Sequence, residues 1–259
     1  MTAEARPGAV PATPTTRRLL ERYPRARALV RRGYYFLRGE PLLTYGEFTR
    51  EKLRDLVRKP DPVILEVGCN DGTNTAWFLE EFPRPRVYCF EPDPRAVERF
   101  RKNIGERSGV HLFHIAIGGR DGETLFHMSG GRETMDMPGG WDFSGSLRKP
   151  KDHLAMFPGI TFDRTITVQV RTLDGWCAQH GVTDIDFLWM DVQGAELDVL
   201  KGGTAALRRT RYVLTEYSTA EVYEGQARLK ALLTAFRGFR VLARYPSDLL
   251  LENRATIET

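Results

Sequence analysis

Short apolar runs alternate with amphipathic stretches along most of this chain of 259 residues. Runs that are apolar at nearly every position predict strands covered on both faces, as in a parallel sheet. The stretches between them carry apolar residues at helical spacing and predict helices. Strands that alternate with helices indicate an α/β domain with a mostly parallel sheet and right-handed crossovers. The five predicted central strands cover residues 63–67, 86–92, 110–117, 185–192 and 212–217.

The same pattern predicts the helices and the strands outside the parallel series. Two of these strands are expected to close the sheet as an antiparallel pair near the C-terminus. Helices are predicted at residues 73–82, 93–104, 173–180, 195–200 and 228–236. The additional strands are predicted at residues 123–128, 165–170, 239–245 and 248–252.

Composition divides the chain into parts. Residues 1–15 are rich in Ala, Pro and Thr and are expected to be a disordered tail. Residues 16–58 carry many arginines among apolar residues and are expected to form a basic helical segment ahead of a domain at 59–259. Within that domain, residues 129–164 are irregular and rich in Gly, Met and Pro. A segment of this length is typical of a lid or substrate loop.

The most informative stretch is the turn that follows the first strand. Gly68 and Gly72 carry no Cβ, so the backbone can come close to a ligand there. Asn70 and Asp71 tolerate left-handed conformations better than most residues. The stretch therefore predicts a ligand-binding turn between a strand and a helix. A tight turn without a ligand is the alternative.

The ligand expected at this turn is S-adenosylmethionine rather than a dinucleotide. The spacing departs from G-x-G-x-x-G because Asn70 replaces the second glycine and Thr73 replaces the third, so a pyrophosphate fits poorly. Glu91 ends the second strand beside the turn, where a carboxylate can accept hydrogen bonds from both ribose hydroxyls. Glu66, at the start of the motif, can face an ammonium group of the ligand, directly or through water. An NAD(P)-dependent oxidoreductase on a related fold is the alternative interpretation.

Two acids end strands that are expected to neighbour the Gly68 turn. Ligands of doubly wound sheets bind at the carboxyl ends of the strands, where strand order reverses, so Asp191 and Glu216 would face the methyl donor. Asp191 is the first candidate for a general base and Glu216 the second. The pair could instead hold a divalent cation such as Mg²⁺. The alternatives are an Asp191 that caps the next helix and a solvated Glu216.

The acceptor is expected to contact the 129–164 segment and the turns after the last two central strands. Trp141 could offer a flat face to a sugar ring. His153 could reach the substrate, although a surface histidine is the more frequent case. Tyr217 and Tyr223 could line the pocket, with ordinary packing as the alternative. The candidate substrate residues are Trp141, Ser144, Ser146, His153, Gln193, Tyr217 and Tyr223.

Composition narrows the class of protein. Apolar residues make up 41% of the chain and charged residues 28%, which is ordinary for a soluble globular protein. No apolar run approaches the roughly 20 residues of a membrane span, and the N-terminus lacks the apolar core of a signal peptide. We therefore expect a cytoplasmic protein. Cys69, Cys89 and Cys177 lack metal-ligand spacing and are expected to be buried.

The basic excess is local. The net charge is only +4, but eight arginines lie between Thr16 and Glu40. They could form a solvated face of packed helices, an arm for a homo-oligomer or partner, or a surface that attracts acidic substrates. An RNA methyltransferase using this segment is a further alternative. Nucleic acid is nevertheless the less expected partner, because residues 191–194 lack the Asn/Asp-Pro-Pro-aromatic sequence expected for base-amine methylation.

Six motifs stand out by their order and spacing. They are Glu66-Val67-Gly68-Cys69-Asn70-Asp71-Gly72, Phe90-Glu91-Pro92, Ala116-Ile117-Gly118, Thr172-Leu173-Asp174, Asp191-Val192-Gln193-Gly194-Ala195-Glu196 with Leu200 and Gly202, and Thr215-Glu216-Tyr217. Together they resemble the motifs of the FkbM family of S-adenosylmethionine-dependent methyltransferases over residues 60–253. One departure is Gln193, where the family commonly has Glu.

The resemblance implies a class I methyltransferase fold, which is Rossmann-like, with a mostly parallel seven-stranded sheet and helices on both faces. In this chain, the predicted N-terminal helical segment at 16–58 and the predicted lid at 129–164 would be additions to that fold. The resemblance also implies O-methylation of a small molecule, often a sugar or a natural-product hydroxyl. The residues expected to hold S-adenosylmethionine are Glu66, Gly68, Asn70, Asp71, Gly72, Thr73, Glu91, Pro92, Ala116 and Asp191.

Overall fold

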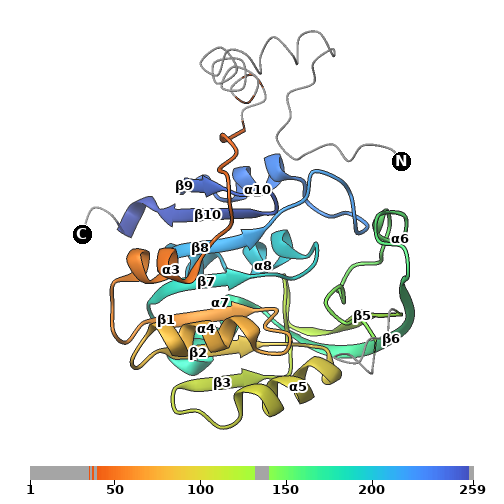
Figure 1. Cartoon of the computed structure of the whole chain (residues 1–259), viewed down its shortest axis with the longest axis horizontal. Coiled ribbons are helices and arrows are strands. Elements are labelled where there is room, and N and C mark those ends of the chain that lie inside the picture. Colours follow the sequence, from red (N-terminus) through yellow and green to blue (C-terminus); the bar gives the residue numbers. More distant parts are fainter. Residues whose placement is uncertain (1–34, 36, 38–39, 132–139, 257–259) are drawn as a thin grey trace.

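A seven-stranded sheet forms the centre of the protein in the computed structural model, which describes residues 35, 37, 40–131 and 140–256 (Figure 1). The strand order is β3-β2-β1-β7-β8-β10-β9. All pairs are parallel except those of β10, which is antiparallel to β8 and β9. This sheet confirms the predicted class I methyltransferase fold. Its strands are β1 Val63–Val67, β2 Arg86–Phe90, β3 Val110–Phe113, β7 Ile185–Met190, β8 Thr210–Glu216, β9 Phe239–Arg244 and β10 Asp248–Asn253.

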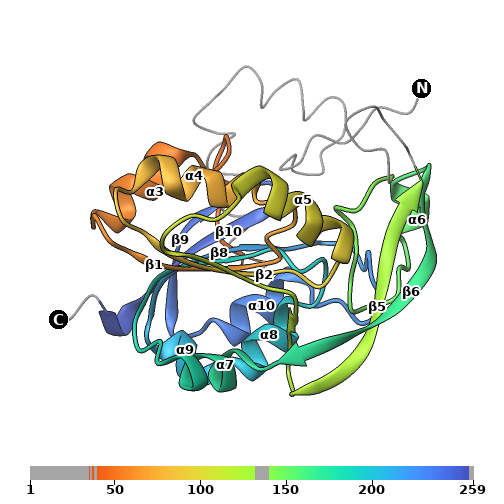
Figure 2. The same cartoon turned by 90° about the horizontal axis from the view of Figure 1, so that it is seen from below.

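Helices cover both faces of the sheet, as Figure 2 shows. The strands are apolar on both sides because each face meets a helical layer: Ile64 packs into one core and Leu65 into the other. One layer consists of α3 Arg50–Val57, α4 Thr73–Glu81 and α5 Pro94–Ile104. The other consists of α7 Leu173–His180, α8 Glu196–Gly202, α9 Thr204–Arg208 and α10 Leu229–Ala235.

A second, three-stranded sheet lies beyond the carboxyl ends of the parallel strands (Figures 1 and 2). It consists of β4 Ala116–Ile117, β5 Gly122–Gly131 and β6 Ile160–Arg171, and a short helix, α6 His153–Met156, lies between β5 and β6 in the chain. The prediction of an irregular 129–164 segment is therefore wrong at both ends, which belong to long paired strands. Residues 132–139 of that segment lie outside the described residues.

The third predicted strand, residues 110–117, is two strands in two sheets. β3 ends at Phe113, and Ile115 N donates to Phe113 O at 2.9 Å, which closes a tight turn. The chain then enters the second sheet as β4, whose Ala116 pairs with Val170 of β6. The sequence does not reveal this change of partner, because apolar residues continue from β3 into β4, although β3 is a partly buried edge strand and β4 is fully buried. The break places Ala116 and Ile117 beside the ends of β1 and β2.

The N-terminal part is anchored to the sheet by Arg244. This buried guanidinium is 2.9 Å from Glu40 Oε2 and lies over the ring of Tyr35, with its Cζ 5.1 Å from the ring centroid. The predicted tail at 1–15 and much of the predicted basic segment at 16–58 lie outside the described residues. Across the described residues, no helix has the length and apolar character needed to cross a membrane.

Glu66 lies inside the protein rather than at the ligand turn. Side chains alternate along β1, so Glu66 points toward α4, where its carboxyl accepts a hydrogen bond from Thr75 Oγ1. Burial is the largest cause that raises its pKa, to about 8. The expectation that Glu66 faces an ammonium group of the ligand is therefore not met by this structure. The three cysteines are buried and free, as expected.

Replacing Gly68 by alanine is expected to cost more than about 4 kcal/mol of unfolding free energy, because the added Cβ would overlap the carbonyl oxygen of Asp191. Gly68 also has a φ of +86°. Gly46→Ala is the matched control, since Gly46 has a φ of +87° and open space around it. Gly46→Ala should lower the unfolding free energy by only about 1 kcal/mol. Urea unfolding of both variants measures the difference, and equal losses would contradict the proposed collision.

Glu66→Gln is expected to flatten the pH dependence of stability. Between pH 4.5 and about 8 the native wild type retains a proton that the unfolded chain has lost, so its unfolding free energy falls as pH rises, by roughly 1 kcal/mol per pH unit. Glutamine does not titrate, so the unfolding free energy of the variant should rise relative to that of the wild type as pH increases across this range. Urea unfolding at several pH values tests this, with Glu98→Gln on the exposed side of α5 as the control. Parallel curves for wild type and Glu66→Gln would refute it.

Candidate active site

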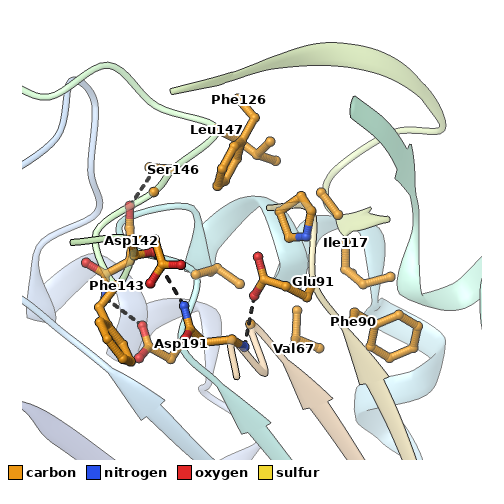
Figure 3. Close-up of a pocket in the computed structure, with 17 residues that line it drawn as sticks. Val67, Phe90, Glu91, Ile117, Phe126, Asp142, Phe143, Ser146, Leu147 and Asp191 are labelled. Atoms are coloured by element: carbon orange, nitrogen blue, oxygen red, sulfur yellow. Dashed lines mark hydrogen bonds between the residues drawn. The ribbon is translucent and has the colours of Figure 1, made fainter. Parts of the chain in front are cut away.

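A pocket lies at the carboxyl ends of β1, β2 and β7. Strand order reverses between β1 and β7, which is where open α/β sheets bind ligands. Figure 3 shows Glu91 in its wall, with Phe126 and Leu147 on the side opposite the strand ends. The lining residues are Val67, Gly68, Asn70, Phe90, Glu91, Pro92, Ala116, Ile117, Phe126, Asp142, Phe143, Gly145, Ser146, Leu147, Asp191, Val192 and Gln193.

The turns after β1 and β2 are joined through the carboxyl group of Glu91. Asn70 N donates to Glu91 Oε2 at 2.9 Å, and Asp93 N donates to Glu91 Oε1 at 2.8 Å. Asn70 has a φ of +44°, so the tolerance of asparagine for left-handed backbone is used here. Each carboxylate oxygen can accept a further hydrogen bond. Glu91 is therefore held in the pocket wall with capacity for two hydroxyl groups.

Glu91 is only 5% exposed, and this determines its electrostatics. Burial is the largest cause that raises its pKa, to about 8, while the hydrogen bonds from Asp93 and Asn70 oppose the shift. Hydrogen bonds to a carboxylate favour its charged form. A ligand that donates two more would therefore stabilise the ionised carboxylate in this position.

Asp191 and Glu216 contact each other and are also linked by Gln193. Gln193 Nε2 donates to Asp191 Oδ1 at 2.7 Å and to Glu216 Oε2 at 3.1 Å. Burial is the main cause that raises the pKa of Asp191. The charge of Asp191, followed by burial, raises the pKa of Glu216 well above its usual value. Asp191 lines the pocket, whereas Glu216 lies behind Gln193 and is not part of the lining.

The segment at 140–147 closes the pocket from the side of the second sheet. Arg99 of α5 pairs with the buried Asp142, with Nη2 2.7 Å from Oδ1, and the same Nη2 donates to Asn70 Oδ1 at 3.1 Å. Ser146 Oγ donates to Gln193 O at 2.7 Å. These contacts tie the segment to the turns after β1 and β7.

The structure brings most of the expected cofactor residues together. Gly68 gives space to the backbone of Asp191, and Gly72 packs against side chains of α5. Asp71 Oδ1 accepts from Thr73 N and Oγ1 at 3.1 and 2.8 Å, so both residues build the turn. The expected residues in the lining are Gly68, Asn70, Glu91, Pro92, Ala116 and Asp191. The expected residues outside it are Glu66, Asp71, Gly72 and Thr73.

The expected substrate residues are divided. Ser146 and Gln193 line the pocket. Tyr217 OH donates to Tyr245 O at 2.8 Å and is part of the core, away from the pocket. Trp141, Ser144 and Tyr223 lie next to the pocket: Trp141 Nε1 donates to Ser144 Oγ at 2.9 Å, and the Tyr223 hydroxyl lies 2.8 Å from Ser144 O and 3.0 Å from Gln193 Oε1.

His153 is not a surface histidine, and that expectation is wrong. It is 2% exposed and packs against the rings of Phe157, Phe162 and Tyr223. Burial lowers its pKa, which favours the neutral ring. Phe157 and Phe162 are near His153 in the chain, but Tyr223 comes from a distant segment, so the local sequence alone does not indicate its burial.

Sequence analysis missed Arg99, Asp142 and Phe143. Asp142 and Phe143 belong to the segment that was expected to cover the substrate, so their position in the lining follows from that prediction in general terms. Arg99 carries no local signal, because its two partners are 29 and 43 residues away in the chain. Of the other apolar lining residues, Val67 and Phe90 end strands that were assigned correctly, whereas Phe126 lies within β5 and Leu147 lies in the segment at 140–147.

The pocket fits S-adenosylmethionine better than a dinucleotide. The paired acceptor oxygens of Glu91 suit a ribose diol, and Pro92, Ile117 and Phe126 offer apolar wall to a base. Asp191 lies at the other end, near Gly68, where a cationic group would be favoured. A pyrophosphate would meet the carboxyl groups of Glu91 and Asp191 instead of a cradle of backbone N–H groups.

Comparison with known proteins agrees with this geometry. The model of the FkbM methyltransferase domain matches residues 66–241. The chain is 46% identical over 202 residues to the 2-O-methyltransferase NoeI of Sinorhizobium fredii (strain NBRC 101917 / NGR234), which covers 76% of this chain and 82% of NoeI. It is 31% identical over 219 residues to the AMB antimetabolite synthetase AmbE of Pseudomonas aeruginosa, which covers 76% of this chain and 10% of AmbE.

Among solved structures, a putative rRNA methylase from Clostridium thermocellum is 10% identical, with a TM-score of 0.45, over 82% of this chain and 98% of that protein. The family match extends from the last part of β1 to β9 and so includes the strand ends that form the pocket. The predicted family, fold and methyltransferase activity are therefore confirmed. The chain belongs to the FkbM family of methyltransferases and is an S-adenosylmethionine-dependent O-methyltransferase.

Proposed function

We propose that the acceptor is a glycoside and that a ring hydroxyl, first of all a 2-hydroxyl, receives the methyl group. The observation that carries this proposal is Asp191, whose carboxyl group lines the pocket beside the Gly68 turn. A carboxylate there suits a hydroxyl acceptor, which must lose a proton. The printed name of NoeI, a 2-O-methyltransferase, supports the choice of position.

Aromatic side chains at the pocket support a sugar as the acceptor. Phe143 lines the pocket and is 39% exposed, so part of its ring is open to a ligand. The ring of Trp141 is 5.1 Å from that of Phe143. Such rings offer broad apolar faces, which suit the C–H face of a pyranose. In this proposal Phe143 contacts the sugar directly and Trp141 supports it.

The proposed mechanism is an in-line displacement. S-adenosylmethionine supplies an electrophilic methyl group on a sulfonium. Glu91 would hold the ribose, and Asp191 would accept the proton of the acceptor hydroxyl as the new C–O bond forms and the C–S bond breaks. Alignment of two reactants can supply effective molarities of about 10⁵–10⁸ M, and a general base typically adds about 10²–10⁴-fold. Glu216 would act through Gln193, because it does not reach the pocket.

The alternative mechanism would use a divalent cation held by Asp191 and Glu216. The two acids would supply only two ligands. Within residues 40–131 and 140–256 and the two described residues before them, no group of three or more His, Cys, Asp or Glu side chains is arranged to hold a metal ion. We therefore favour Asp191 as a base without a metal ion.

Three expectations stay predictions. They are the cytoplasmic location, association of copies through the N-terminal segment and the absence of nucleic acid as a partner. The pocket gives no support to an RNA acceptor, because carboxyl groups but no arginine or lysine are among its described lining residues, and the nearby Arg99 is paired with Asp142.

Glu91→Ala is expected to weaken binding of S-adenosylhomocysteine by about 10–100-fold, since hydrogen bonds to a charged group contribute about 1.5–3 kcal/mol. Calorimetric titration of the wild type and the variant measures this. Glu98→Ala is the matched control, because Glu98 is an exposed acid on the neighbouring helix. Thermal unfolding establishes that each variant is folded. Equal affinity in the wild type and a folded Glu91→Ala would exclude the proposed ribose contact.

Methyl glycosides with a free 2-hydroxyl are expected to be methylated, whereas the matching 2-deoxy glycosides are not. Transfer of a labelled methyl group from S-adenosylmethionine measures both. Asp191→Asn should lower kcat by about 10²–10⁴-fold on the accepted sugar. Equal methylation of a sugar and its 2-deoxy analogue would overturn the assigned position. Failure of every glycoside, with intact cofactor binding, would overturn the acceptor class.

A further inference from the structure

Gln193 is tied into the active site by both its backbone and its side chain. Its φ is +49°, a left-handed conformation that residues with side chains seldom adopt. Its carbonyl oxygen accepts a hydrogen bond from Ser146 Oγ. Strained conformations persist where the surroundings hold them, and they gather at functional sites. The strain at Gln193 therefore indicates a functional role.

The side-chain amide of Gln193 lies between the two acids. Nε2 is 2.7 Å from Asp191 Oδ1 and 3.1 Å from Glu216 Oε2. A primary amide has two N–H groups, so each carboxyl group receives one. On the other side, Gln193 Oε1 is 3.0 Å from the Tyr223 hydroxyl. Turning the amide over would place Oε1 against both acids, so their charge fixes its orientation.

The amide takes up the position that a bridging cation would need. Mg²⁺ and Ca²⁺ lie about 2.0–2.6 Å from their oxygen ligands, so a cation shared by Asp191 and Glu216 would have to lie close to both. Nε2 already lies within 3.1 Å of an oxygen of each. A cation and this amide cannot occupy that space together.

An uncharged amide also leaves the two acids unequal. The charge of Asp191 is the largest cause that raises the pKa of Glu216. A cation between them would lower both pKa values, whereas the amide only offers one N–H to each. The arrangement thus favours an ionised Asp191 facing the pocket and a protonated Glu216 behind it.

We propose that Gln193 is a positioning residue that replaces a bridging cation: its amide holds the Asp191 carboxylate toward the pocket and excludes metal ions from the pair. The proposal rests on the proposed function only for the role of Asp191 as base. During transfer the proton of the acceptor hydroxyl passes to Asp191, and the amide keeps both of its hydrogens.

Binding of Mn²⁺ tests the proposal without an acceptor. Electron paramagnetic resonance of free Mn²⁺ is followed as wild type, Gln193→Glu or Gln179→Glu is added as the full chain. Gln179 is exposed on α7, so its variant carries the same change of charge away from the pocket. Wild type and Gln179→Glu should leave Mn²⁺ free. Gln193→Glu should bind one Mn²⁺ per chain, because three carboxyl groups then converge. Adding Glu216→Gln should weaken that binding at least about ten-fold.

Two results overturn the proposal. One is a wild type that binds one Mn²⁺ per chain and loses it in Asp191→Asn, since the cation would then share the space given to the amide. The other is a folded Gln193→Glu that binds none. If Gln193→Glu does not fold, methyl transfer by the wild type decides: EDTA should leave the rate unchanged within about two-fold, and loss of the activity overturns the proposal.

These results are separate from those for the proposed function. A wild type that binds no Mn²⁺ beside a Gln193→Glu that does supports the role of the amide even where no glycoside is methylated. A wild type whose Mn²⁺ site is removed by Asp191→Asn overturns the role of Gln193 and leaves glycoside methylation standing.

Discussion

The close backbone contact between Gly68 and Asp191 is the constraint on which the active site depends. A Cβ at residue 68 would overlap the carbonyl oxygen of Asp191, and Asp191 N donates to Val67 O at 2.9 Å. The ends of β1 and β7 therefore stay in register up to the point where both strands stop. This is also where strand order reverses, so the pocket opens there. Gly68 therefore allows β1 and β7 to come close together, and it affects ligand binding only through the shape that this contact gives the pocket.

Buried acids concentrate around this joint, and each has a raised pKa, mainly through burial for Glu66, Glu91 and Asp191 and mainly through the charge of Asp191 for Glu216. Glu91 and Asp191 line the pocket, Glu216 is behind it and Glu66 is below the turn, toward α4. Unpaired charges in such places are costly. A donor that carries a positive sulfonium and two ribose hydroxyls offsets that cost in a way that a phosphate-bearing cofactor cannot. Backbone N–H groups of Asn70 and Asp93 hold Glu91, whereas Gln193 holds Asp191 through both its side-chain amide and its backbone.

The second sheet turns an open strand edge into an enclosed pocket. Its strands support the 140–147 segment, and Arg99 fastens that segment to the turn after β1 through Asp142 and Asn70. Tyr223 and Ser146 fasten it to Gln193. The cofactor turn, the proposed base and the proposed sugar contact at Phe143 are thus parts of one hydrogen-bonded unit. A substitution in any one of these parts is therefore expected to shift the position of the others.

The sequence by itself determined the parallel strands, their helices, the turn at Gly68, the acid at Glu91 and the strand-end acid at Asp191. These follow from local pattern, because strand burial, turn chemistry and the position of a residue at a strand end are all encoded within a few residues. Only the tertiary structure decided that Glu66 faces α4, that residues 110–117 divide between two sheets, that His153 is buried and that Arg99 reaches Asp142. Each of these depends on partners distant in the chain. Gln193 shows the difference most clearly: its place after a strand could be predicted, but the two carboxyl groups that its amide joins are brought together only by the pairing of β7 with β8.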